Sequence, residues 1–97
     1  MNNSVNLVFD KTLTKLAGFP YGEKIFDEQV KDQVDFSKTC EIVFPENIES
    51  VAISFVNGFF TGIVNKIGLQ GIDDNILLKT SSEELTKDIW KKLHIVV

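Results

Sequence analysis

The stretch SFVNGFFTGIVNKIG, residues Ser54 to Gly68, decides the fold expected for this chain. At about 100° per residue, its large side chains gather on one broad half of a helix: Phe55, Val56, Phe59, Phe60, Ile63, Val64 and Ile67. The other half holds only small or uncharged residues: Ser54, Asn57, Gly58, Thr61, Gly62 and Asn65. A solvated helix face normally carries charged residues, so the bare half of this helix requires its own explanation.

The two glycines of the bare half suggest that something approaches this helix closely. Gly58 and Gly62 each cost about 1 kcal/mol relative to Ala in a helix interior, and they recur at every fourth position after Ser54. Either they pack against a neighbouring helix or loop of the same chain, or they form an open docking surface for a partner protein. In the second interpretation the contact residues are Ser54, Asn57, Gly58, Thr61 and Gly62.

The rest of the sequence alternates between strand-like and helix-like segments. Helical periodicity is expected in residues 23–34, 54–68 and 81–93, and Ser81 with Glu84 has the spacing of a capping box. We expect strands at 4–10, 40–44 and 76–80, a short extended piece or a tight connection at 48–53, and a last strand in the tail 94–97. Residues 18–22 and 69–75 are expected to be loops, with Gly68 ending the central helix. This order predicts a single α/β domain over residues 1–97, a sandwich of about three helices on a parallel or mixed sheet of about four to five strands.

Composition argues against several classes of function. The formal net charge of the 97 residues is −4, whereas a nucleic-acid-binding protein usually has a basic patch. One Cys and one His allow neither an internal disulfide framework nor a Cys/His zinc site. We therefore expect no metal, no cofactor and no nucleic-acid partner, and a reducing cytoplasm as the compartment.

The sequence also predicts no association with a membrane. Its most apolar segment, VAISFVNGFFTGIV (residues 51–64), is shorter than the roughly twenty residues of a spanning helix and contains Ser, Asn and Thr. The start of the chain lacks a basic region followed by a long apolar run, so no targeting signal is expected.

No combination of residues predicts catalysis. His94 has no nucleophile near it in sequence, Cys40 opens an expected buried strand, and Asp73 with Asp74 supplies too few ligands for a calcium loop. The segment GFPYG (residues 18–22) lacks the Lys and Ser/Thr of a phosphate-binding loop. The sequence therefore predicts a protein that is not an enzyme.

Two adjacent segments, CEIVF (residues 40–44) and SFVNGFFTGIVNKIG, resemble a known family. With GEKIFDEQV before them and ILLKTS after them, they are similar to STAS-like domains of unknown function from bacteria and their phages. These domains are relatives of the sulfate-transporter and anti-sigma-factor-antagonist domain, and the resemblance covers residues 5–93. It implies a STAS-like sandwich and a non-enzymatic regulatory module that binds other proteins.

The resemblance also implies a role for Ser54. In the antagonist relatives, a Ser or Thr at the start of the matching helix is phosphorylated by a partner kinase, so a kinase-like ATPase is the implied partner. A phosphate there would meet free N–H groups at the helix N-terminus and would add repulsion to an interface. The antagonists have an acidic residue, two serines and a glycine where this chain has Ala52-Ile53-Ser54-Phe55. The simpler interpretation is that Ser54 only caps the helix.

Three other classes of function remain open on the sequence. A small acidic protein of this size can be a phage or mobile-element inhibitor of a host enzyme. It can be an enzyme or a carrier of a small ligand. It can also be a structural module that forms a homodimer through the small-residue face of the central helix.

Overall fold

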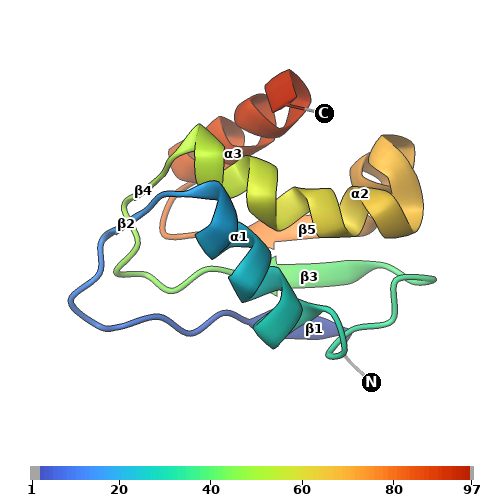
Figure 1. Ribbon diagram of the computed structural model, residues 1–97, viewed down its shortest axis with the longest axis horizontal. Helices are drawn as coiled ribbons and strands as arrows, with labels where there is room; N and C mark the ends of the chain where they lie inside the picture. Colours follow the sequence, from blue (N-terminus) through green and yellow to red (C-terminus); the bar gives the residue numbers. More distant parts are fainter. Residues whose placement is uncertain (1–2, 97) are drawn as a thin grey trace.

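The computed structural model describes residues 3–96 and has an α/β architecture with three helices and two small parallel sheets (Figure 1). Its elements follow in chain order: β1 (Ser4–Asn6), β2 (Lys15–Leu16), α1 (Phe19–Ile25), the π-helical turn η1 (Phe26–Val30), β3 (Cys40–Val43), β4 (Ser50–Val51), α2 (Ile53–Asn75), β5 (Ile76–Lys79) and α3 (Glu83–Val96). The predicted α/β class is confirmed, and every strand pair in the described residues is parallel rather than mixed.

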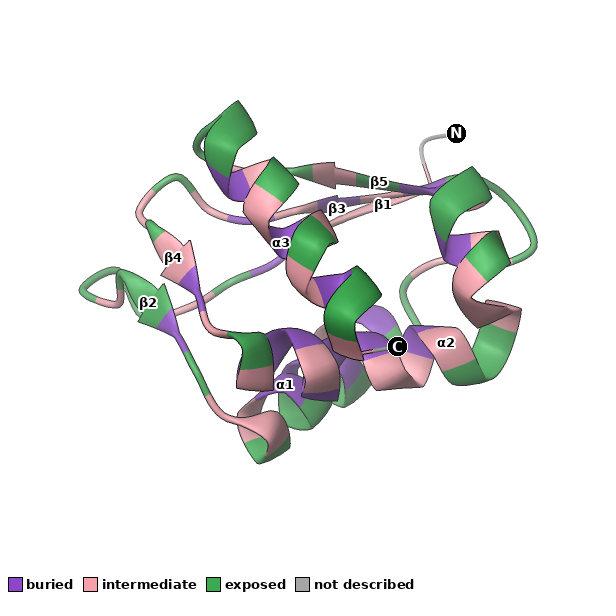
Figure 2. Cartoon of the chain, turned by 90° about the horizontal axis from the view of Figure 1, so that it is seen from above, coloured by how far each residue is buried: buried purple, intermediate pink, exposed green. Residues whose placement is uncertain are grey.

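The larger sheet has the strand order β1-β3-β5, and Val5, Ile42 and Leu78 lie side by side across it. The smaller sheet pairs β2 with β4, where Leu16 lies beside Val51. Figure 2 shows α1 and α2 on one side of the larger sheet and α3 crossing α2. Side chains alternate along each strand, so Val5, Ile42 and Leu78 face the core while the residues between them face the other side of the sheet.

The core lies between the larger sheet and α2, and the apolar half of α2 fills it as the periodicity predicts. Phe55, Phe59 and Phe60 are at most 1% exposed. The rings of Phe55 and Phe59 are stacked with centroids 5.7 Å apart, and Phe60 meets Phe59 edge-on at 5.1 Å. Phe44, just after β3, joins them from the sheet side at 6.1 Å from Phe59. This aromatic cluster ties the central helix to the middle strand.

Helix α1 packs on the small-residue half of α2. A methyl group on Gly58 would collide with the backbone carbonyl of Phe19, and one on Gly22 would lie 2.7 Å from the backbone nitrogen of Phe59. Because neither glycine has a side chain, the two helix backbones touch directly. A methyl group on Gly62 would collide with the ring of Phe26. The small residues of α2 are therefore required by the packing of this chain on itself.

The first helix begins earlier than predicted, which makes the expected loop at 18–22 wrong. Pro20 occupies the first turn of α1, where its missing N–H needs no partner and its fixed φ suits a helix. Gly18 precedes the helix with a φ of 103°, a conformation that favours glycine. The same helix was predicted to continue to residue 34, but it ends in the wider turn η1 at Val30, where the Lys31 N–H donates to the Phe26 carbonyl.

Two predicted segments beyond the central helix are also wrong. Gly68 interrupts α2 with a φ of 73°, but the chain then resumes a helix to Asn75 in place of the predicted loop at 69–75. Burying Ile72 in the core favours this extra turn. The strand predicted at 94–97 is instead helical up to Val96, and Val97 lies outside the described residues. Ile89 and Leu93 are buried on one side of α3, and this helical spacing of buried residues favours continuation of the helix.

Strand lengths and one cap differ from expectation. The strand predicted at 4–10 is shorter, because β1 ends at Asn6. The segment 48–53 contains only the two-residue strand β4, and β5 ends at Lys79, one residue before the predicted end. The predicted capping box on Ser81 is wrong by one residue, because the Ser82 hydroxyl accepts the Leu85 N–H at 3.1 Å. Ser81 instead donates its hydroxyl to the Ile48 carbonyl. Within residues 3–96, no helix has the length and apolar character needed to cross a bilayer.

The contact between the two backbones predicts a large penalty for the smallest side chain at Gly58. Gly58→Ala should lower the free energy of unfolding by about 1–3 kcal/mol, because the methyl group forces α1 away from α2. Asn65→Ala, at an exposed position of the same helix, is the matched control and should change stability by about 0.5 kcal/mol or less. Urea denaturation followed by circular dichroism measures both, and equal stability of the two variants would contradict the contact.

Candidate functional site

The predicted docking residues on α2 do not form one open surface. Gly58 is buried against Phe19, and Gly62 is covered by the ring of Phe26. Ser54, Asn57 and Thr61 are half-buried. The expectation that this face of the helix is open in the isolated chain is therefore wrong at both glycines, because α1 and η1 occupy the space that the glycines leave.

A shallow groove remains along the same helix. It has a volume of about 170 Å³ and lies between α1 with η1 on one side and α2 on the other. Its lining combines two carboxylates, one aromatic ring and the small or polar side of α2: Glu23, Phe26, Asp27, Gly58, Thr61, Gly62 and Asn65. We call this feature the α1–α2 groove.

The polar groups of the α1–α2 groove differ in how they are already used. Thr61 is bound internally, since its hydroxyl donates to the Asn57 carbonyl at 2.6 Å. Glu23 and Asp27 are exposed, and no cation of residues 3–96 pairs with either of them. The groove therefore presents two exposed carboxylates beside a hollow lined by two glycines and by Phe26, which is itself only 4% exposed.

Ser54 holds the start of α1 rather than the start of its own helix. Its hydroxyl oxygen accepts the Gly18 N–H at 2.9 Å. The N-cap of α2 is Ala52, which makes no side-chain capping bond, so the interpretation of Ser54 as a simple cap is wrong. Next to it, Ile53 is 41% exposed. The first turn of α2 thus presents an apolar side chain beside a hydroxyl that positions the neighbouring helix.

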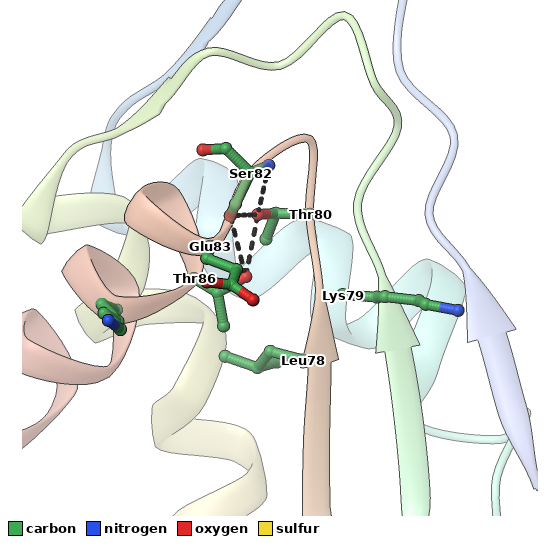
Figure 3. Close-up of a pocket in the computed structure, with 7 residues that line it drawn as sticks. Leu78, Lys79, Thr80, Ser82, Glu83 and Thr86 are labelled. Carbon is green, nitrogen blue, oxygen red and sulfur yellow. Dashed lines mark hydrogen bonds between the residues drawn. The ribbon is translucent and has the colours of Figure 1, made fainter.

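A second hollow, of about 410 Å³, lies where β5 ends and α3 begins (Figure 3). Its hydroxyl groups bond to one another: Thr80 Oγ1 lies 2.9 Å from Thr86 Oγ1 and donates to the Ser82 carbonyl at 2.7 Å. Lys79 extends away from the hollow, across β3. The hydroxyl groups here are occupied by the turn itself, and the hollow is also lined by two charged side chains of α3, Glu83 and Lys87.

The remaining reactive side chains do not converge on a reacting position. Cys40 is buried, and burial raises the pKa of its thiol, which keeps the sulfur in the less nucleophilic protonated form. Asn3 donates its side-chain N–H to this sulfur at 3.1 Å. Across residues 3–96, no three His, Cys, Asp or Glu side chains cluster closely enough to hold a metal ion.

His94 has a partner that the sequence did not indicate. Its Nε2 lies 2.9 Å from Asp73 Oδ1, and its Nδ1 lies 2.7 Å from the Trp90 carbonyl. The two residues of the ion pair are separated by 21 positions, and Asp73 was expected in a loop, so no local pattern could reveal the pair. It joins the last turn of α3 to the part of α2 beyond Gly68.

The chain matches no family model, no curated protein and no solved structure. The α1–α2 groove and the uncovered face of the larger sheet are therefore interpreted from their own residues and geometry. Of the residues predicted to form a site, the groove retains Gly58, Thr61 and Gly62 and adds Glu23 and Asp27 from α1 and η1.

The Asp73–His94 pair predicts a pH dependence with a definite sign. Hydrogen bonds to the Trp90 carbonyl and to Asp73, with the charge of Asp73, raise the pKa of His94 above its ordinary 6.5. A raised pKa in the folded state adds stability that is fully present below the unfolded pKa and is lost as pH rises through the folded pKa. NMR titration of the imidazole should therefore give a pKa above that of an unfolded His, and Asp73→Asn should lower it. A pKa that Asp73→Asn leaves unchanged would contradict the pairing.

Proposed function

We propose that this chain is a non-enzymatic regulatory module that binds a partner protein through the α1–α2 groove. The observation that supports this most directly is the exposed pair of carboxylates, Glu23 and Asp27, at the edge of the hollow between α1 and α2. Exposed carboxylates next to a shallow recess provide both charge and room for a side chain within a few residues. Such a combination suits one long side chain that has an apolar stem and a charged end.

The partner chemistry that fits is an exposed Arg or Lys. The stem of such a side chain can lie over Thr61 and Gly62 while its charged group bonds to Glu23 and Asp27. Arg fits better, because its planar group offers several donors to two carboxylates. The net charge of −4 of the whole chain favours approach of a basic partner.

Ser54 supplies a control point in this proposal. A phosphate on its hydroxyl would displace the bond to the Gly18 N–H and would change how α1 begins, close to the groove. The kinase-like ATPase and the STAS-like architecture belong to the proposal through the resemblance described above. The order of a short β3, a brief connection and the Ser54 turn of α2 supports that part of it.

The test measures binding of a defined probe, the capped amino acid N-acetyl-arginine-amide, by NMR titration of the ¹⁵N-labelled chain. The proposal expects saturable shifts at the amides of Thr61 and Asn65. The double variant Glu23→Gln/Asp27→Asn should weaken binding about ten-fold or more, because charge-assisted bonds are lost.

The matched control is Glu83→Gln/Glu84→Gln, which removes the same charge from two exposed residues of α3. It should leave the shifts at Thr61 and Asn65 unchanged. The proposal would be contradicted if both double variants reduced the chemical-shift changes equally, or if the changes at the groove did not saturate with added probe. The same titration with N-acetyl-lysine-amide tests the expected preference for Arg.

A further inference from the structure

The larger sheet is covered on one face only. In Figure 2, α1 and α2 lie on one side of β1, β3 and β5, and no other described element forms a layer on the opposite side. All-parallel sheets are usually buried on both faces. The uncovered face is formed by the outward side chains of two rows across the strands: Ser4, Glu41 and Leu77 in one row, and Asn6, Val43 and Lys79 in the other. We call it the outer sheet face.

The outer sheet face carries two apolar side chains, Val43 on the middle strand β3 and Leu77 on the edge strand β5. Leu77 is 55% exposed, although its neighbours on the same strand, Ile76 and Leu78, point to the core side. Val43 is half-buried in the adjacent row. An exposed leucine next to a valine on an otherwise uncovered sheet indicates a surface that can bury further area.

The charges on this face have a diagonal arrangement. Glu41 lies beside Leu77, and Val43 lies beside Lys79, in successive outward rows of β3 and β5. Strands are about 4.8 Å apart and outward rows about 6.7 Å apart, so the backbone positions of these four residues form the corners of a small rectangle. Glu41 and Lys79 hold one diagonal, and Leu77 and Val43 hold the other. Figure 3 shows the Lys79 side chain extending from its own corner across the neighbouring strand β3.

We propose that the outer sheet face binds a second copy of this chain, face to face. A twofold axis close to the Leu77–Val43 diagonal brings each Glu41 opposite Lys79 of the second copy. The same axis brings Leu77 and Val43 opposite their own counterparts. A twofold interface must be self-complementary, and this arrangement meets that requirement with two ion pairs around an apolar centre.

One edge of the larger sheet, at β1, is partly covered against pairing with a further strand. Just after β1, the Val8 N–H donates to Gln29 Oε1 at 2.7 Å, and Gln29 Nε2 donates to the Val8 carbonyl at 2.8 Å. A side-chain amide thus occupies the backbone groups that a further strand would use there. This cover resists strand addition at the β1 edge of the sheet.

The proposed dimer is weak and depends on salt. A stable interface buries roughly 800 Å² per partner, which is more than six residues of short strands provide, so dissociation in the sub-millimolar range is expected. The two ion pairs lie near solvent and are screened as ionic strength rises. This inference is independent of the α1–α2 groove, which lies on the other side of the sheet, so either proposal can fail alone.

Sedimentation velocity from about 10 µM to 1 mM tests the inference through charge reversal. The wild-type chain should shift from monomer toward dimer, and Glu41→Lys or Lys79→Glu alone should abolish the shift. An equimolar mixture of the two variants should dimerise again, because each Lys then faces a Glu of the other copy. The double variant Glu41→Lys/Lys79→Glu should also dimerise, through exchanged pairs.

Matched controls are Glu28→Lys on η1 and Lys91→Glu on α3, which make the same charge changes at exposed positions away from this face. Both should dimerise like the wild-type chain. A wild-type chain that remains monomeric at the highest concentration would overturn the inference. So would a mixture of the two single variants that does not associate, or controls that lose association equally. Glu41→Gln and Lys79→Gln remove one charge without reversing it. Each should weaken association, and a mixture of the two should associate no better than either variant alone. They replace any charge-reversal variant that circular dichroism shows to be unfolded.

Discussion

Where α1 crosses α2, two glycines let the backbones of the helices touch. Gly58 leaves room for the carbonyl of Phe19, and Gly22 leaves room for the backbone of Phe55 and Phe59. A side chain at either position would separate the helices. The close approach also sets the position of Phe26 over Gly62, so the depth and the lining of the α1–α2 groove follow from it. Most of the small-residue half of α2 is therefore a packing surface for α1 and η1. Only the part that borders the α1–α2 groove is a candidate binding surface.

The same arrangement determines which side of the sheet stays uncovered. Helix α2 brings Phe55 and Phe59 onto the sheet, and α1 closes over α2, so these helical layers lie on one face. Seven of the eight phenylalanines belong to that core or pack against it. The opposite face of the larger sheet retains an exposed leucine, Leu77, between charged neighbours. The molecule thus has two candidate surfaces of different chemistry, an acidic groove and a mixed apolar and charged sheet face.

The element types were largely predictable from sequence, because the periodicity of apolar residues reports burial directly. The apolar half of α2 and the stripe of α3 were identified this way. The boundaries were less predictable where one residue has two uses. Pro20 can end a helix or begin one, and Gly68 can stop a helix or only interrupt it. Deciding between these uses requires the tertiary contacts, such as burial of Ile72, that sequence alone does not give.

The candidate sites were harder to predict than the fold. Small uncharged residues at every fourth position fit an open docking face and a close helix contact equally well, and only the position of α1 separates them. The carboxylates of the groove come from α1 and η1, so they join Thr61 only after the helices pack. The diagonal of Glu41 and Lys79 depends on the register between β3 and β5, which no local pattern fixes.

The account rests on the backbone contact between α1 and α2, and NMR observes that contact directly. A ¹⁵N-edited NOE spectrum of the wild-type chain should contain cross-peaks between the Gly22 α-protons and the amide proton of Phe59, because a substituent on Gly22 would lie 2.7 Å from the Phe59 nitrogen. Their presence would place the two helices in contact as described. Their absence, in a folded chain whose Gly22 and Phe59 resonances are assigned, would contradict the packing from which the groove and the uncovered sheet face are derived.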